Sequence, residues 1–270
     1  MNDKKQIFGW AMYDWANSAF ATTILVGVFP LYFGSVIVPE GGALIGGEKY
    51  SATALLGFMS SFYAMVLFLC APVLGAIADF SSTKKRFLMV FCYVGSLFSI
   101  LLGLCGPGDV WLAMLIFVVA QIGFVGGNIF YDAFLPQIAS EEHIDWVSGK
   151  GFAYGYIGGG IQLALAFGLI AAHDTLGISE MLAARIAMAT TGLWWGGFSI
   201  FTFVYLKESN GISSSAVILK APESWLDYLR IGVRRTLKTA GKVKRFKYLL
   251  LFLFAFMIYN DAIQTVIKMA

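Results

Sequence analysis

Three short groups of polar and acidic residues stand inside otherwise apolar stretches of this 270-residue chain. In the first group, Asp14, Asn17 and Ser18 follow the i, i+3, i+4 spacing that places side chains on one face of a helix, and Thr22 continues the stripe. An aspartate at membrane depth costs about 2.5–3.5 kcal/mol, so it normally faces a cavity or a polar partner. Such a face can hydrogen-bond a polar solute and hold a proton, which is the chemistry of a permeation pathway.

The other two groups have the same helical spacing, and we predict that all three groups line a substrate or proton pathway. They are Asn128, Tyr131 and Asp132 in the second group, and Asp261, Gln264 and Thr265 in the third, where Asn260 precedes the aspartate.

The three aspartates leave different alternatives open. Asp14 and Asp132 lie near predicted helix ends, where a carboxylate reaches headgroup water, and Asp14 can also favour its helix electrostatically by sitting near the N-terminus. A purely structural role therefore stays open for both. Asp261 lies fourteen residues beyond Lys247, so an interfacial role is harder to defend for it.

Residues for enzymatic chemistry are missing from the sequence. No nucleophile stands with an associated base, and His143 and His173 fall in predicted loops without a carboxylate or cysteine cluster. The three cysteines are widely spaced and show neither a metal spacing nor a disulfide framework. We therefore predict a protein that is not an enzyme and has no metal and no cofactor.

Composition places these groups in a bilayer. The chain is 59% hydrophobic and 13% charged, against roughly 25% charged residues in soluble domains. Its apolar stretches reach the roughly 20 residues that cross a hydrocarbon core of about 30 Å. The sequence predicts an all-α integral membrane protein with helices over about residues 10–38, 52–79, 87–105, 110–138, 151–172, 183–206 and 247–270.

Lysine and arginine give the orientation, because they concentrate on the cytoplasmic side of membrane proteins. Outside the last predicted helix, only Lys49 and Arg185 fall on the opposite side. This places the N-terminus and the 207–246 segment in the cytoplasm, and the even number of crossings ahead of that segment agrees with six helices. We expect an inner-membrane protein with a six-helix bundle over 1–206, a basic cytoplasmic linker over 207–246, and helix 7 over 247–270.

Two interpretations of the basic linker stay open. Trp225, Leu229, Val233 and Leu237 recur every four residues with arginines between them, which predicts an amphipathic helix on the membrane surface. The alternative is a solvated linker whose charges only enforce topology. A role in binding nucleic acid is not expected, because topology already accounts for the basic residues.

Two glycine patterns predict helix contacts. Gly75, Asp79, Lys84 and Lys85 surround the loop between the second and third helices, where we predict a cytoplasmic gate in which Asp79 pairs with a cation or with backbone amides. Gly75 would let neighbouring helices approach closely. The fifth helix opens with glycines at small-residue spacing, which indicates close packing of helices and not a phosphate-binding loop. They are Gly151, Gly155, Gly158, Gly159 and Gly160.

Several of these segments resemble a known family. The run from Gly75 to Lys85 resembles the loop signature of the major facilitator superfamily, although Phe80 and Ser82 depart from its usual pattern. The octapeptide YDWANSAF at 13–20 is similar to the opening of the vacuolar-effluxer, autophagy-related branch and its bacterial relatives. Further similarity to that branch lies in FYDAFLP at 130–136, GYIGGG at 155–160 and YNDAIQT at 259–265.

The resemblance implies a twelve-helix transporter of two bundles that works by alternating access, with helices 1, 4 and 7 lining a central cavity. We therefore expect a secondary transporter of a small solute, with an amino acid favoured by the family's vacuolar exporters and one aspartate as a candidate carrier of a coupling proton. The chain would end inside helix 7, so a missing C-terminal bundle, or a second copy in a dimerising half-transporter, would complete the carrier. The rival class is a non-transporting membrane receptor or scaffold.

Overall fold

Helices make up most of the described residues in the computed structural model. It describes residues 1–80, 83–208, 230, 233–234, 237–238, 241–242 and 246–269, without the side chains of 76–77, 79–80, 260–261 and 263–269. All seven predicted helices are present, so the all-α prediction is confirmed. The amphipathic helix predicted in the 207–246 linker lies mostly outside the described residues.

The first helix is one continuous rod, Lys4–Ile37, with changes of helical register along it. Asp3 starts it by accepting the Lys5 N–H at 2.8 Å, and this hydrogen bond lowers the pKa of the Asp3 carboxyl. Pro30 cannot donate a hydrogen bond and its ring crowds the carbonyl four residues earlier, so wider π turns precede it. The segments are α1 (Lys4–Ala19), η1 (Phe20–Val28), α2 (Phe29–Tyr32) and η2 (Phe33–Ile37).

The remaining elements follow in simple order. An antiparallel hairpin of β1 (Ala43–Ile45) and β2 (Glu48–Tyr50) connects the first helix to the next one. The fourth predicted helix divides in two where Pro136 opens a new short helix. The helices are α3 (Ala52–Phe80), α4 (Lys84–Leu102), α5 (Val110–Asp132), α6 (Leu135–Ile138), α7 (Ile144–Ala171), α8 (Glu180–Tyr205) and α10 (Lys247–Met269).

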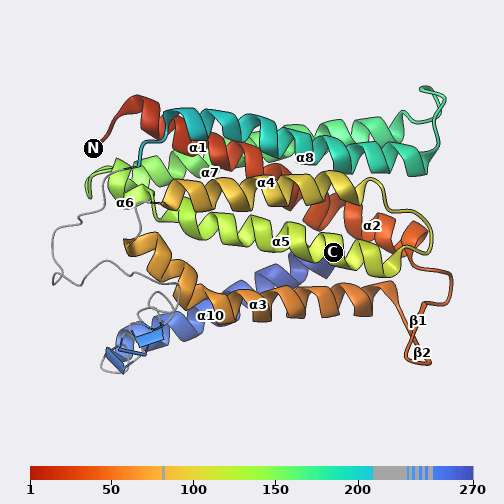
Figure 1. Cartoon of the computed structure of the whole chain (residues 1–270), viewed down its shortest axis with the longest axis horizontal. Helices are drawn as coiled ribbons and strands as arrows, with labels where there is room; N and C mark the ends of the chain where they lie inside the picture. The colour runs from red at the N-terminus through yellow and green to blue at the C-terminus, as the bar shows by residue number, and fades with distance from the viewer. Residues whose placement is uncertain are drawn as a thin grey trace.

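The long helices run side by side, with the N-terminus and α6 at one end of the bundle and the β1–β2 hairpin at the other (Figure 1). α1 packs against α7 and α8, α5 packs against α3 and α4, and α4 packs against α8. This set of contacts is unchanged when α1, α3 and α4 are exchanged with α5, α7 and α8. The match is partial, because α7 also packs against α8, whereas no contact of that extent joins α3 to α4 among the described residues.

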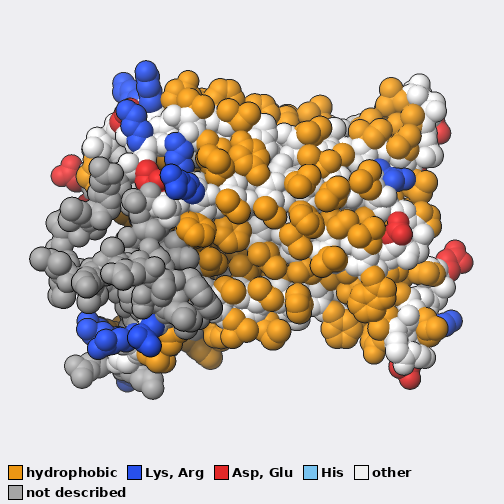
Figure 2. All heavy atoms as spheres, viewed as in Figure 1, with side chains coloured by type: hydrophobic (Ala, Val, Ile, Leu, Met, Phe, Trp, Pro, Cys, Tyr) orange, Lys and Arg blue, Asp and Glu red, His pale blue; other side chains and the backbone are white. Residues whose placement is uncertain are grey.

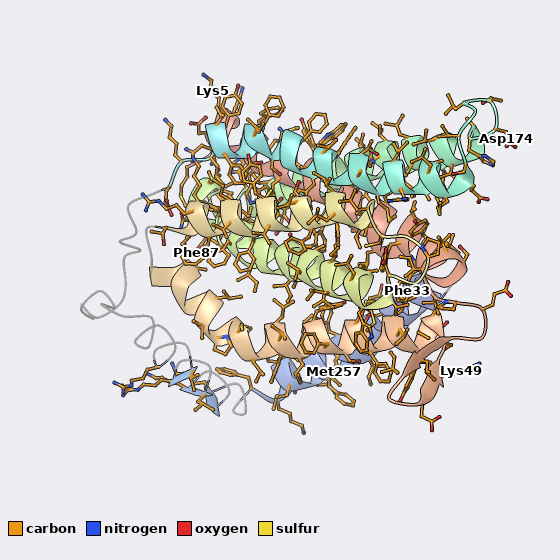
Figure 3. The ribbon with its side chains drawn as sticks, turned by 45° about the vertical axis from the view of Figure 1, so that its right-hand side comes forward. Lys5, Phe33, Lys49, Phe87, Asp174 and Met257 are labelled. Atoms are coloured by element: carbon orange, nitrogen blue, oxygen red, sulfur yellow. The ribbon has the colours of Figure 1, made fainter. Side chains whose placement is uncertain are left out.

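A broad apolar belt surrounds the middle of the bundle, and charged side chains gather at its two ends (Figure 2). Large side chains such as Phe62, Phe68, Tyr156 and Leu193 are exposed within the belt. Lys5 stands at one end of the bundle, whereas Lys49 and Asp174 stand at the other (Figure 3). An exposed apolar belt of this kind matches a hydrocarbon environment, which confirms the membrane class predicted from composition.

Five described helices are long and apolar enough to cross a membrane, and α8 is not among them. The prediction of six crossings ahead of the linker is thus met in helix number but not in hydropathy. The reason lies in the buried face of α8, which packs on α1 and α4 with small and polar residues. These include Thr191, Gly192, Gly196, Ser199 and Thr202.

Candidate functional site

A pair of asparagines joins α1 to α5 inside the bundle. Asn17 is 2% exposed, and its Nδ2 donates a hydrogen bond to Oδ1 of Asn128 at 2.7 Å. Asn17 Oδ1 is buried and has no partner among the described residues. A buried acceptor without a partner costs about 1–3 kcal/mol, so this atom favours a hydrogen-bond donor from water or a bound molecule. The two predicted groups therefore meet here.

Three aromatic rings stack beside this pair. Tyr131 lies between Trp10 and Tyr13, with ring centroids 4.4 Å and 5.0 Å away, and Trp10 Nε1 donates to the Tyr131 carbonyl oxygen at 3.0 Å. The hydroxyl groups of Tyr13 and Tyr131 are both buried and make no hydrogen bond of standard geometry, although Tyr131 interacts with the Asp14 carboxylate and Tyr13 with the Trp195 side chain. Tyr131 was predicted as a pathway residue, whereas the stacking partners on α1 were missed. The available signal was the pair Trp10 and Tyr13, which stand three residues apart directly ahead of Asp14.

Asp14 and Asp132 differ in their surroundings. Asp14 is partly buried, and its Cβ and backbone lie beside Gly155 of α7. Asp132 is the last residue of α5 and is exposed. Both therefore lie toward the end of the bundle that carries the N-terminus. That position is compatible with the pathway role and with the structural alternative.

Ser18 and Thr22 face α7. A Cβ atom on Gly155 would come within 2.7 Å of Ser18 Oγ, and one on Gly159 would come within 3.0 Å of the Ser18 carbonyl oxygen. Thr22 Oγ1 donates to the Gly159 carbonyl oxygen at 2.9 Å. These polar atoms therefore support helix packing. The predicted stripe divides, because Asp14, Ser18 and Thr22 lie at the α1–α7 contact whereas Asn17 bonds to α5.

The glycines of α7 form that contact. Gly151 touches the Trp10 ring, and Gly158 touches Trp15 so closely that a Cβ atom would overlap its backbone oxygen. This confirms the predicted close packing for Gly151, Gly155, Gly158 and Gly159. Gly160 is different, because no described atom lies within 4 Å of the position of a Cβ there.

The predicted gate residues are only partly brought together. Lys84 is 8% exposed, and the Lys85 N–H donates to Glu208 Oε1 at 3.2 Å, a partner that was not predicted. Outside its own helix backbone, no described atom lies within 4 Å of the position of a Cβ on Gly75, so the close helix approach there stays a prediction. The side chain of Asp79 lies outside the described structure.

The third polar group is placed only by its backbone. α10 is helical through Asp261, Gln264 and Thr265, but the side chains of these residues lie outside the described structure. The described side chains from Lys247 to Tyr259 are exposed.

Polar contacts elsewhere in the bundle were not predicted. Gln162 of α7 donates through Nε2 to Thr191 Oγ1 of α8 at 3.0 Å. Arg185 donates through Nε to the Gly103 carbonyl oxygen at 2.6 Å and thereby covers the end of α4. The amide at membrane depth was a signal for the first contact. Within the described residues, no group of three histidine, cysteine or acidic side chains could hold a metal ion.

The sequence is similar to those of known proteins. The family model described as "Vacuole effluxer Atg22 like" matches residues 2–145 and 141–270. The chain belongs to this family. It is 33% identical over 270 residues to a protein of Bacillus subtilis named as the uncharacterized MFS-type transporter YxiO, covering 98% of the chain and 59% of YxiO.

Fungal members are more distant. The chain is 22% identical to Autophagy-related protein 22-1 of Phaeosphaeria nodorum and 21% identical to Autophagy-related protein 22 of Coccidioides immitis. Each match covers 97% of the chain, and 59% and 58% of those proteins. The chain thus spans about three-fifths of the length of these relatives. No solved structure matches it. The family match confirms the resemblance inferred from the motifs and makes the chain part of a membrane transporter family.

Proposed function

We propose that this protein is a secondary transporter that moves a small polar solute, with an amino acid favoured, across the inner membrane by alternating access. The observation that carries the proposal is the junction of α1 and α5, where Asn17 and Asn128 are hydrogen-bonded at 2.7 Å beside two aspartates. Buried hydrogen-bonding groups without partners suit a site that exchanges water for a polar solute.

The polar pathway would consist of residues from both groups. Asn17 and Asn128 would bind the solute, while Asp14 and Asp132 would carry charge near the cytoplasmic end. A carboxylate that meets water in one state and is buried in the other changes its proton affinity between the states, which couples protonation to movement. Asp261, Gln264 and Thr265 would extend this lining on helix 7.

The rest of the carrier follows from the organisation proposed for the chain. The six helices of 1–206 would form one bundle, and the basic 207–246 segment would lie in the cytoplasm and lead to helix 7. Gly75, Asp79, Lys84 and Lys85 would act at the cytoplasmic gate. Because YxiO and the fungal relatives are longer, a second bundle or a second copy would supply the opposite wall of the cavity.

The test is uptake of radiolabelled amino acids by proteoliposomes that hold the full-length protein, with and without a pH gradient. We expect uptake that rises with the gradient and falls about tenfold or more for Asp14→Asn or Asp132→Asn. Asp174→Asn is the matched control, because its exposed carboxylate lies at the opposite end of the bundle. Full gradient-driven uptake with asparagine at Asp14, Asp132 and Asp261 together would refute proton coupling. Absence of any substrate-dependent flux would favour a receptor or scaffold.

A further inference from the structure

A cavity with a mixed apolar and polar lining lies apart from the α1–α5 junction, at the end of the bundle that carries the N-terminus. It has a volume of about 410 Å³. Its floor is apolar, because Ile7 and Val147 are both buried there. The polar residues that line it are Asn2, Lys4, His143 and Lys150, with Trp146 beside them.

The chain terminus is tied down at this cavity. Asn2 donates its backbone N–H to the Ile138 carbonyl oxygen at 2.7 Å and its Nδ2 to Ser140 Oγ at 3.0 Å, while the Ser140 N–H donates to Asn2 Oδ1 at 3.0 Å. Asn2 takes a positive φ of 64°, a conformation that asparagine tolerates better than most residues. These three bonds fix the wall that holds Lys4.

The cations of the cavity are also held in place. Lys150 Nζ lies 5.5 Å from the ring centroid of Trp146 and 5.7 Å from that of Tyr154, which are cation–π distances. His143 Nδ1 lies 3.1 Å from Ser140 Oγ. When that hydroxyl donates to Nδ1, the ring proton stands on Nε2 and is available to an anion.

Acidic groups do not compensate these cations within the cavity. The described residues that line it include no aspartate or glutamate. Four acidic residues are close in sequence to the lining residues but do not line the cavity themselves: Asp3, Glu141, Glu142 and Asp145. The Asp3 carboxylate already accepts the Lys5 N–H. Two lysines, a histidine N–H and an asparagine amide around one space are the donor set that binds a phosphate group.

The surface below the cavity is apolar. Ile157 and Ile161 follow Lys150 by seven and eleven residues, so all three lie along one side of α7, and both isoleucines are exposed. Trp146, which is 62% exposed, has the amphipathic ring that favours the level of lipid headgroups. A ligand with a phosphate at one end and acyl chains at the other would contact both regions.

We propose that this cavity binds the phosphodiester headgroup of an anionic phospholipid, with an acyl chain along Ile157 and Ile161. The proposal rests on the proposed cytoplasmic position of the N-terminus, which places the cavity at the inner leaflet. Basic pockets at this level of a bundle are suited to anionic headgroups, because each nearby lysine adds to the attraction. A bound lipid would hold the α1 terminus against α7.

The experiment is native mass spectrometry of the full chain in detergent, titrated separately with phosphatidylglycerol, phosphatidylcholine and inorganic phosphate. The test variant is Lys4→Gln with Lys150→Gln. The control is Lys5→Gln with Lys49→Gln, which removes the same charge from outside the cavity. We expect phosphatidylglycerol to bind about 30-fold more weakly to the test variant and almost normally to the control.

Each other outcome is decisive. Equal loss of lipid in both double variants, or loss in neither, would overturn the proposal. Inorganic phosphate that binds as tightly as the lipid and is lost in the same variant would assign the cavity to free phosphate and overturn the lipid source. Lys4→Arg with Lys150→Arg checks folding, because it keeps the charges and should retain the lipid. Binding is measured without flux, so a protein that fails to transport but retains lipid overturns the proposed function alone.

Discussion

The helices α7 and α3 pack against the rest of the bundle in different ways. α7 packs against α1, and α3 packs against α5. The first contact is made through glycines and a hydrogen bond from Thr22 to the Gly159 carbonyl oxygen. Among the described residues, the glycines of α3 make no such contact, and most of its buried positions hold large side chains, Leu55, Met59, Tyr63 and Leu67.

This difference has a physical consequence. In a bilayer, helices associate through van der Waals packing and hydrogen bonds, because lipid removes the hydrophobic driving force between them. Glycines bring two backbones together over a long contact that tolerates no added atom. Flexible side chains such as Met59 can adjust when a neighbour changes. The α1–α7 contact should therefore be more rigid and more sensitive to substitution than the α3–α5 contact.

The largest expected effect comes from filling the glycine contact. Gly158→Leu would drive a side chain into the backbone and ring of Trp15, so we expect a loss of about 3 kcal/mol of unfolding free energy or failure to fold. The measurement is unfolding of the purified protein in detergent, followed by circular dichroism. Gly160→Leu is the matched control, since no described atom lies within 4 Å of its Cβ position. Equal damage from both variants would contradict the comparison.

A smaller effect is expected at the other contact. Met59 is 1% exposed on α3, so Met59→Ala leaves a cavity but no clash. We expect a loss of about 1–2 kcal/mol, because the removed atoms lose packing contacts whereas lipid keeps the transfer term small. The same unfolding measurement applies. Met65→Ala, at a position that is 55% exposed to the apolar belt, should change little. A loss at Met59 larger than that at Gly158 would reverse the ranking of the two contacts.

The α1–α7 contact could be predicted from the sequence better than the α3–α5 contact. Small residues four apart stand out in an apolar helix, so Gly151, Gly155 and Gly159 predict a close helix contact without knowledge of the partner helix. In α3 almost every residue is apolar, and no periodicity separates Met59 from Met65. In a lipid-facing helix, both buried and exposed positions are hydrophobic, so composition cannot tell them apart.

Some other features could be predicted from the sequence, and others depend on the three-dimensional fold. The apolar spans were predicted well, because apolar length is set by the bilayer. The polar first turns were missed: α1 begins at Lys4 and not near 10, and α7 begins at Ile144 and not near 151. The β1–β2 hairpin was missed, although Gly46 and Gly47 take the positive φ values, 60° and 92°, that a two-residue turn requires. The Asn17–Asn128 bond joins residues 111 positions apart, so only the packing of α1 on α5 could bring them together.

The smallest predicted effect concerns the hydrogen bond within the glycine contact. Thr22→Val keeps the shape of the side chain but removes the donor to the Gly159 carbonyl oxygen. We expect a loss of about 0.6 kcal/mol, the average for hydrogen bonds between membrane helices, measured by the same unfolding assay. Thr22→Ser retains the hydroxyl and should lose less. If Thr22→Val instead cost more than Met59→Ala, the hydrogen bond and not the glycine packing would dominate the α1–α7 contact. The α1–α7 and α3–α5 contacts would then differ mainly in hydrogen bonding, and Gly158→Leu alone would no longer measure that difference.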